Sequence, residues 1–263
     1  RGARQKANGG RPNGAEKRWA GKTWERSPAW WFFLACSTTA RERAYVEALA
    51  ARYSAKKSVT RKAKDEAYAK AMRQVAREAP DDADAATIAA EAMLVLRPWD
   101  YWRADGRPQP GTEEILAILE AALRQHPDHP GACHYYIHAV EASPDPQRAL
   151  DCAKRLPSLM PGAGHLVHMP AHIYMRLGRY REASERNATA AMVDHEYLSR
   201  HPLEGNYASG YYAHNLHFLN ASLMMEGRSA EALQVARDLL VKVPADEIAK
   251  EPSLEWYAPT VLL

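Results

Sequence analysis

Small and apolar residues recur at helical spacing through the central part of the chain, in pairs of segments joined by a tight turn. Val167 and Ala171 precede the turn at Gly178, and Ala183 and Ala190 follow it. Residues four or seven positions apart lie on the same face of an α-helix. The pattern therefore predicts two amphipathic helices that pack against each other as a hairpin.

The hairpin pattern occurs three times, over residues 130–161, 164–195 and 213–244. Pro127 and Pro161, which close successive units, are 34 residues apart, and this period is typical of tetratricopeptide repeats. The turn residues Gly178 and Gly227 are 49 residues apart, so about 15 residues are inserted around 194–212. We expect the insertion to form a loop that covers a binding face.

Helical spacing continues upstream, at residues 39–53, 64–79, 84–96 and 112–125. The last two segments form an irregular repeat that is divided by the loop 97–111. We therefore expect one helical-repeat domain over residues 39–263. Residues 1–38 carry eight Lys or Arg against two acidic residues, are rich in Trp and show no helical period. We interpret them as a disordered or non-native extension of a chain fragment, rather than as a basic arm for nucleic acid.

Three long segments are more distinctive than a general repeat pattern: HPGACHYYIHAVEAS from His129, PGAGHLVHMPAHIYMRLGRY from Pro161 and YYAHNLHFL from Tyr211. In these segments the chain from about residue 39 onward resembles a bacterial family of tetratricopeptide-repeat proteins. The resemblance implies an all-α solenoid of helical hairpins wound as a right-handed superhelix. It implies no settled biochemical activity, so function has to be inferred from the residues.

The histidines follow the repeat. His134 and His168 are 34 residues apart, and so are His138 and His172. In a solenoid, equivalent positions of neighbouring repeats stack side by side, so a periodic histidine becomes a row of histidines in space. Seven of the eleven histidines occupy positions that face the concave groove of such an array, namely His134, His138, His165, His168, His172, His214 and His217.

Rows of imidazoles at this spacing favour a transition-metal site. Neighbouring helices pack about 8–10 Å apart, a span that two imidazoles can bridge around one ion. The predicted ligands of a divalent first-row metal, Zn, Fe or Cu, are His134, His138, His168, His172, His214 and His217. Glu141 is a candidate further ligand, general base or imidazole-orienting acceptor. Further groove residues that would contact a ligand are His165, Glu141, Tyr135, Met175, Arg176 and Asn215.

Two residues depart from the usual repeat. Pro170 lies inside the first helix of its hairpin, where its missing amide proton should interrupt the helix and re-aim His168 relative to His172. Asn187 stands where an aromatic residue is usual. The remaining histidines, His126, His129, His195 and His201, fall at turns or in the insertion, and we expect them to be ordinary surface residues.

Composition is that of an ordinary folded protein, with 46% hydrophobic and 25% charged residues. Three cysteines without a CxxC spacing indicate neither a disulfide framework nor a cysteine-based zinc site, so a reducing compartment and a cytoplasmic location are expected. No apolar run approaches the roughly 20 residues of a membrane span. No HExxH, GxSxG or phosphate-binding glycine loop occurs, so an enzyme here would be a metalloenzyme.

The sequence thus leaves two hypotheses. In the first, a helical-repeat scaffold binds a peptide, a protein segment or a small ligand in a histidine-lined groove that also carries a transition-metal site. In the second, the scaffold is a metalloenzyme, a metal-dependent hydrolase or oxidoreductase. A histidine-lined groove that binds an acidic peptide without any metal remains open within the first hypothesis.

Overall fold

The computed structural model describes residues 39–53, 58–201 and 207–242. The helices that these residues form are, in chain order, α2 (Ala40–Ala50), α3 (Arg61–Glu78), α4 (Ala83–Leu94), α5 (Thr112–Gln125), α6 (Pro130–Val140), η2 (Pro146–Ala149), α7 (Leu150–Leu159), α8 (Gly164–His168), α9 (Pro170–Arg176), α10 (Tyr180–Arg200), η3 (Tyr207–Tyr212), α11 (Ala213–Met225) and α12 (Ser229–Lys242). No β-strand occurs among the described residues. The predicted extension 1–38 and the end of the third hairpin at 243–244 lie outside them.

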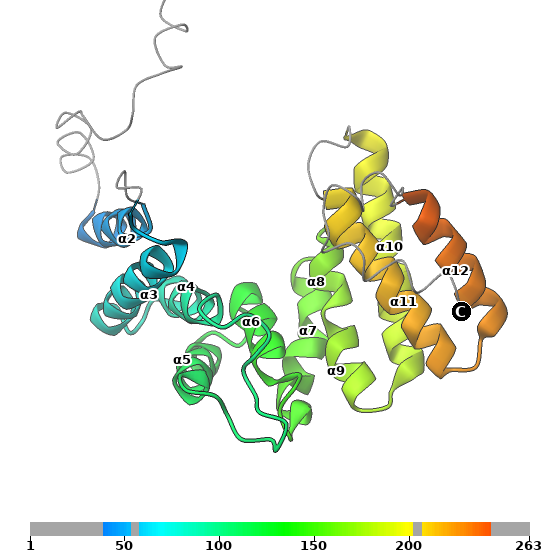
Figure 1. The fold of residues 1–263 in the computed structure, drawn as a ribbon, viewed down its shortest axis with the longest axis horizontal. Helices are drawn as coiled ribbons and strands as arrows, with labels where there is room; N and C mark the ends of the chain where they lie inside the picture. The colour runs from blue at the N-terminus through cyan, green and yellow to red at the C-terminus, as the bar shows by residue number, and fades with distance from the viewer. Residues whose placement is uncertain (1–38, 54–57, 202–206, 243–263) are drawn as a thin grey trace, which may run out of the picture.

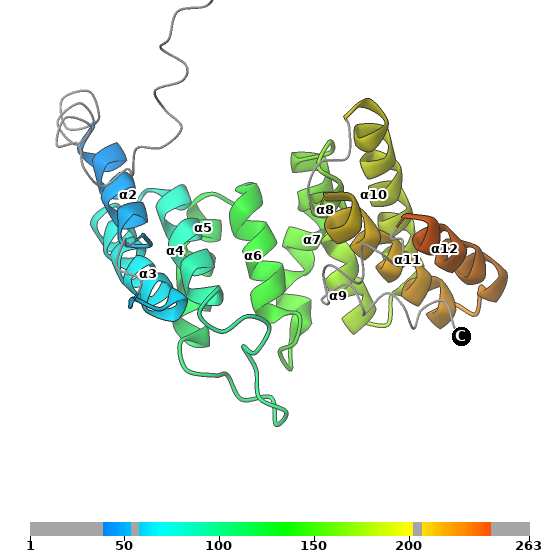
Figure 2. The ribbon, with the colours of Figure 1, turned by 45° about the horizontal axis from the view of Figure 1, so that its top comes forward.

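The helices follow one another across the molecule in chain order, from α2 at one end to α12 at the other (Figure 1). Consecutive helices pack as hairpins: α4 with α5, α6 with α7, α8 and α9 with α10, and α11 with α12. The first helices of neighbouring hairpins also touch, because α6 contacts α4 and α9, and α8 contacts α11. Figure 2 shows the same stacking in a tilted view. The predicted all-α hairpin array is therefore confirmed.

Local sequence signals set where the helices begin. Thr39 caps α2 by accepting from the amide of Glu42 at 3.2 Å, while the Glu42 carboxylate accepts from the amide of Thr39 at 2.7 Å. Asp82 caps α4 through the amide of Ala85 at 3.0 Å. His129 caps α6, because its Nδ1 accepts from the amide of Ala132 at 3.0 Å. The cap explains this histidine without any role in metal binding.

The turns between paired helices lie where the sequence predicts them. Gly178 and Gly227 have φ angles of +70° and +74°, in the left-handed region that glycine adopts without steric cost. Each glycine ends the first helix of its hairpin and lets the chain reverse into the second.

The first helix of the central hairpin is interrupted, as Pro170 predicts. α8 ends at His168, and α9 begins at Pro170. The amide of His172 donates to the carbonyl of Met169 at 3.2 Å, a tighter pairing than that of a regular α-helix. The interruption falls between His168 and His172, so the two rings need not keep the orientation of a continuous helix.

Two irregular segments flank the first helices. In the segment between α4 and α5, the indole of Trp102 donates to the carbonyl of Ala139 in α6 at 2.7 Å. Trp99 in the same segment has a φ of +62°, which is strained for a large side chain. The predicted insertion is largely helical, which corrects the expectation of a loop, because α10 extends to Arg200 and η3 leads into α11. Residues 202–206 of the insertion lie outside the described residues.

Candidate metal centre

Six histidines from the first helices of three consecutive hairpins meet at one place. They are His134 and His138 from α6, His165 and His168 from α8, His172 from α9, and His214 from α11. The centroids of neighbouring rings are 4.7 to 6.3 Å apart. Stacking of equivalent repeat positions has thus produced the cluster that the 34-residue period predicts.

The six rings form two groups of three. In what we call the inner group, His168, His172 and His214, the candidate ligand atoms all lie within 4.8 Å of one another. The same holds for the outer group, His134, His138 and His165. Three imidazole nitrogens at such separations can reach one metal ion after small side-chain adjustments.

The inner group is enclosed by protein. His168 is fully buried, and His172 is 5% exposed. Their Nε2 atoms lie 2.9 Å apart. On its other side, His168 Nδ1 lies 2.6 Å from the Oδ1 atom of Asn187, a fully buried residue of α10. The second helix of the hairpin therefore holds the ring that the first helix presents.

Glu141 connects the two groups. It lies directly after α6, where its carboxylate accepts from His138 Nδ1 at 3.0 Å and from His172 Nδ1 at 2.7 Å. Burial opposes ionisation of this carboxyl, but the His172 and His138 imidazoles outweigh it and lower the pKa of Glu141. The carboxylate thus fixes both rings with their Nε2 atoms directed away from it.

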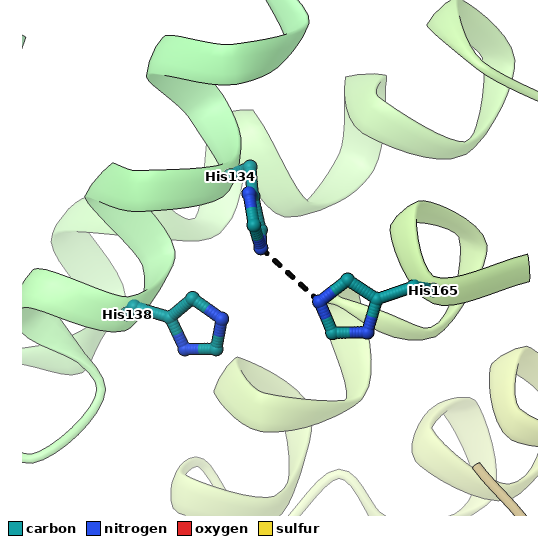
Figure 3. Close-up of side chains that lie close together, drawn as sticks. All are labelled: His134, His138 and His165. Carbon is teal, nitrogen blue, oxygen red and sulfur yellow. Dashed lines mark hydrogen bonds between the residues drawn. The ribbon is translucent and has the colours of Figure 1, made fainter. Parts of the chain in front are cut away.

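The outer group is shown in Figure 3, where His134 and His165 approach each other and His138 lies beside them. The Nε2 atoms of His134 and His165 are 3.2 Å apart. The Nδ1 atom of His165 is buried and has no hydrogen-bond partner. Apart from His138, these rings therefore lack the hydrogen bonds to oxygen acceptors that hold His168 and His172.

Burial favours the neutral form of His134, His165, His168 and His214. It lowers the pKa of His134 to about 2, and that of His165 and of His214 to about 3, with neighbouring imidazoles adding to the effect. The pKa of fully buried His168 is lowered well below its ordinary value for the same reasons. Neutral imidazole is the form that binds metal.

Hydrogen bonds determine which nitrogens of the inner group carry protons. The Ser222 hydroxyl donates to the carbonyl of Phe218 at 2.7 Å and so accepts from Asn187 Nδ2 at 3.3 Å. These hydrogen bonds fix the orientation of the Asn187 amide, so its Oδ1 atom accepts a hydrogen bond from the N–H of His168 Nδ1. Because His172 Nδ1 donates to Glu141, the metal-binding, neutral form of His172 directs its Nε2 lone pair at Nε2 of His168.

A cavity of about 550 Å³ opens beside the outer group. Its wall includes all three outer histidines together with Tyr135, which is among the predicted groove residues, and Tyr211 from η3. Trp99 also lines it, with its ring edge-on to His138 at a centroid distance of 5.0 Å. The inner group contributes only His214 to the wall, so the two groups differ in access.

Two predicted residues lie elsewhere. His217 belongs to neither group, although it follows His214 by only three positions on α11. Asn215 is fully buried and donates to the carboxylate of Asp194 at 2.6 Å, so it joins α11 to α10 instead of contacting the cavity. His165, predicted only as a groove residue, takes a place within the outer group.

Met175 and Arg176 were also predicted to contact a ligand in the groove, and neither lines the cavity. The Met175 sulfur lies 3.5 Å from the Ser222 hydroxyl, so this side chain packs between α9 and α11. Arg176 is exposed on the last turn of α9 and does not line the cavity. Both lie on α9, three and four positions after His172.

Two further residues of the site were not predicted from the sequence. Asn187 holds His168, and its one signal was a polar residue at a position where the repeat usually has an aromatic. Trp99 lies in a segment that sequence patterns identify only as irregular. His126, His195 and His201 are exposed, in agreement with the surface positions expected for them.

No protein-family model and no curated protein matches this sequence. Among solved structures, the MamA protein is similar with a TM-score of 0.53 and 11% identity, over 80% of this chain and 96% of its own. TTC0263, a thermophilic TPR protein of Thermus thermophilus, is similar with a TM-score of 0.51 and 16% identity, over 85% of this chain and 100% of its own. At such identities the likeness shows the fold alone, an all-α, tetratricopeptide-like solenoid. Within the described ranges, no helix is both long and apolar enough to span a bilayer.

Proposed function

We propose that this protein is a tetratricopeptide-like binding scaffold that holds a first-row transition-metal ion in its inner group of histidines. The observation that carries the proposal is the pair of Nε2 atoms of His168 and His172, 2.9 Å apart on rings whose Nδ1 atoms each have their own oxygen partner. Two buried lone pairs in contact repel unless a cation or a proton lies between them.

A metal ion fits this position better than a proton. A shared proton would place a positive charge on His168, whose complete burial lowers its pKa and disfavours that charge. Two nitrogens bound to one tetrahedral ion at about 2.0–2.1 Å lie about 3.3 Å apart, so the rings need separate only slightly. His214 supplies the third nitrogen.

The inner histidines have the hydrogen-bond acceptors that usually accompany metal-ligating histidines in proteins. Ligating histidines usually donate their second N–H to a carboxylate or a carbonyl oxygen, which fixes the ring and raises its basicity. Glu141 and Asn187 supply these two acceptors for His172 and His168. Imidazole ligands suit Zn, Fe and Cu, and these are the ions that we propose.

The outer group provides a second position with access from outside. Its three histidines line the cavity, and His138 shares Glu141 with the inner group. We infer that a second ion binds here more weakly and with an open coordination position. A small ligand or the side chain of a bound peptide could then reach the metal, and this cavity is what favours metal-dependent chemistry as the second candidate function.

Metal binding can be tested with the full chain, purified without a histidine tag and freed of metal by a chelator. Titration with Zn²⁺ or Co²⁺ in a calorimeter should give one tight site per chain. Asn187→Leu should weaken that site by about 10–100-fold because it releases His168, and His172→Gln should weaken it further. His201→Gln, which replaces an exposed histidine, is the matched control.

Binding that is no tighter in the parent chain than in His172→Gln would reject the metal proposal and leave the peptide-binding scaffold. Pro170→Ala provides a separate geometric test. It should join α8 to α9, rotate His168 relative to His172 and lower the affinity, with helix content unchanged or raised in circular dichroism.

A further inference from the structure

Two of the three cysteines lie together in the core, although the sequence separates them by 19 positions. Cys133 is in α6 and Cys152 is in α7, and their sulfur atoms are 2.7 Å apart. Both side chains are buried, at 0% and 4% exposure. The antiparallel packing of α6 on α7 thus presents one thiol directly to the other.

We propose that Cys133 and Cys152 form a disulfide that links the two helices of this hairpin. The sulfurs already lie so close that only small side-chain rotations are needed to reach the bond length of about 2.05 Å. The link joins the helix of His134 and His138 to its partner, and neither cysteine lines the cavity. It does not depend on the metal proposal, because neither sulfur belongs to the candidate metal groups.

A positive charge lies near the two sulfurs. Arg155 is one turn after Cys152 and interacts with both sulfurs, while its Nε atom lies 3.7 Å from the Asp128 carboxylate. A guanidinium beside a thiol favours the thiolate form. Either cysteine can therefore attack first, and the other then completes the bond.

The oxidant is a small-molecule disulfide. The thiolate of one cysteine attacks one of its sulfurs, forms a mixed disulfide and releases one thiolate. The other cysteine then loses its proton to solvent and attacks the sulfur of the first, which forms the internal bond and releases the second thiolate. Two protein thiols are oxidised and one disulfide is reduced to two thiols, so atoms and electrons balance.

Access to the buried sulfurs requires α7 to open. This helix is short, follows the 3₁₀ turn η2 and contains Pro157, which removes one backbone hydrogen bond. Local opening is favoured in such segments. We therefore expect oxidation of the folded protein to be slow, and to accelerate in moderate urea.

The test uses the full chain with Cys36→Ser, so that only the two core cysteines remain. After incubation with oxidised glutathione, intact mass should fall by two hydrogen atoms. Trypsin should then release peptides 125–148 and 149–154 as one linked species that dithiothreitol separates. In the matched controls, Cys133→Ser and Cys152→Ser, the remaining cysteine should instead carry one glutathione once the protein is unfolded.

The proposal is overturned if both thiols stay reduced in the folded and the partly unfolded chain, or if each carries its own glutathione. Stability gives a second readout, since a link across this loop restricts the unfolded chain. The oxidised protein should unfold at a higher urea concentration than its reduced form. A lower midpoint would mean that the linked geometry does not fit the native packing, and would likewise overturn the proposal.

Discussion

Acidification of the metal-free protein should destabilise it strongly, because folding buries several imidazoles in their neutral form. The perturbation is a change from about pH 7.5 to about pH 5.5, which spans the ordinary histidine pKa of about 6.5. In the folded protein, burial lowers the pKa of His134, His165 and His214 to about 2, 3 and 3. These rings stay neutral across that range when folded and become protonated when unfolded.

The direction of the stability change follows from the number of protons that the folded and unfolded chains bind. Below about pH 6.5 the unfolded chain binds more protons than the folded one, so the free energy of unfolding falls as pH falls. Each such histidine contributes a loss of about 1.4 kcal/mol over the two pH units, so these three together contribute about 4 kcal/mol. His138 and His168, whose pKa values are also lowered, act in the same direction. The whole free energy of unfolding of a typical domain is only about 5–15 kcal/mol.

The buried carboxyl groups change the pH dependence of stability in a different way from the histidines. The lowered pKa of Glu141 contributes stability that is lost only below the ordinary glutamate range, outside this window. The raised pKa values of Asp194 and Glu91 act with the opposite sign and reduce the total. A difference between two variants is therefore a sharper measurement than the total loss.

The assay is urea denaturation followed by circular dichroism, in the presence of a chelator, at several pH values. His214→Gln should reduce the pH-dependent loss by about 1.4 kcal/mol, whereas His126→Gln, at an exposed position, should leave it unchanged. The reasoning fails if the parent chain loses less than about 1 kcal/mol over this range, or if His214→Gln has the same pH dependence as the parent.

Three further predictions concern residues that position the site. In Gly164→Ala, the new Cβ would lie 1.9 Å from the buried Asp194 carboxylate, so we expect the free energy of unfolding in urea to fall by about 2–3 kcal/mol. The control Gly162→Ala has no atom within 4 Å of its new Cβ and should be as stable as the parent. Equal stability of the two variants would contradict this packing. Tyr207→Phe removes the hydroxyl that donates to Asp194 at 2.7 Å and should cost about 2 kcal/mol, so an unchanged urea midpoint would argue against that hydrogen bond. Trp99→Gly relieves a φ of +62° at a residue 68% exposed, so its stability should stay within about 1 kcal/mol of the parent; a larger loss would mean that the indole packs more firmly than its exposure indicates.

The helical array could be predicted from the sequence because its signals are local. Apolar spacing, cap residues such as Thr39 and turn residues such as Gly178 act within a few positions of the chain. The predicted segments 39–53, 64–79, 84–96 and 112–125 accordingly agree with α2 to α5 to within a few residues. The interruption at Pro170 was predictable for the same reason, since proline acts on its own turn.

The repeat period also brought the histidines into one region of the fold, because stacked hairpins place equivalent positions side by side. It did not determine which rings meet. Periodicity fixes the angle of a residue around its helix, but the distance between helices and the side-chain rotamers depend on packing. His165 therefore joins the cluster and His217 does not, although both hold groove positions in the repeat.

Only the tertiary structure decided the contacts between hairpins and across them. Asn187 reaches His168 from the second helix, Glu141 joins His138 to His172 across two repeats, and Cys133 meets Cys152 where α6 packs on α7. Such pairs are set by how helices pack in three dimensions and leave little trace in local spacing. The sequence by itself determined the helices, their pairing and the region where the histidines gather; packing determined which atoms face each other there, and hence the chemistry that the site supports.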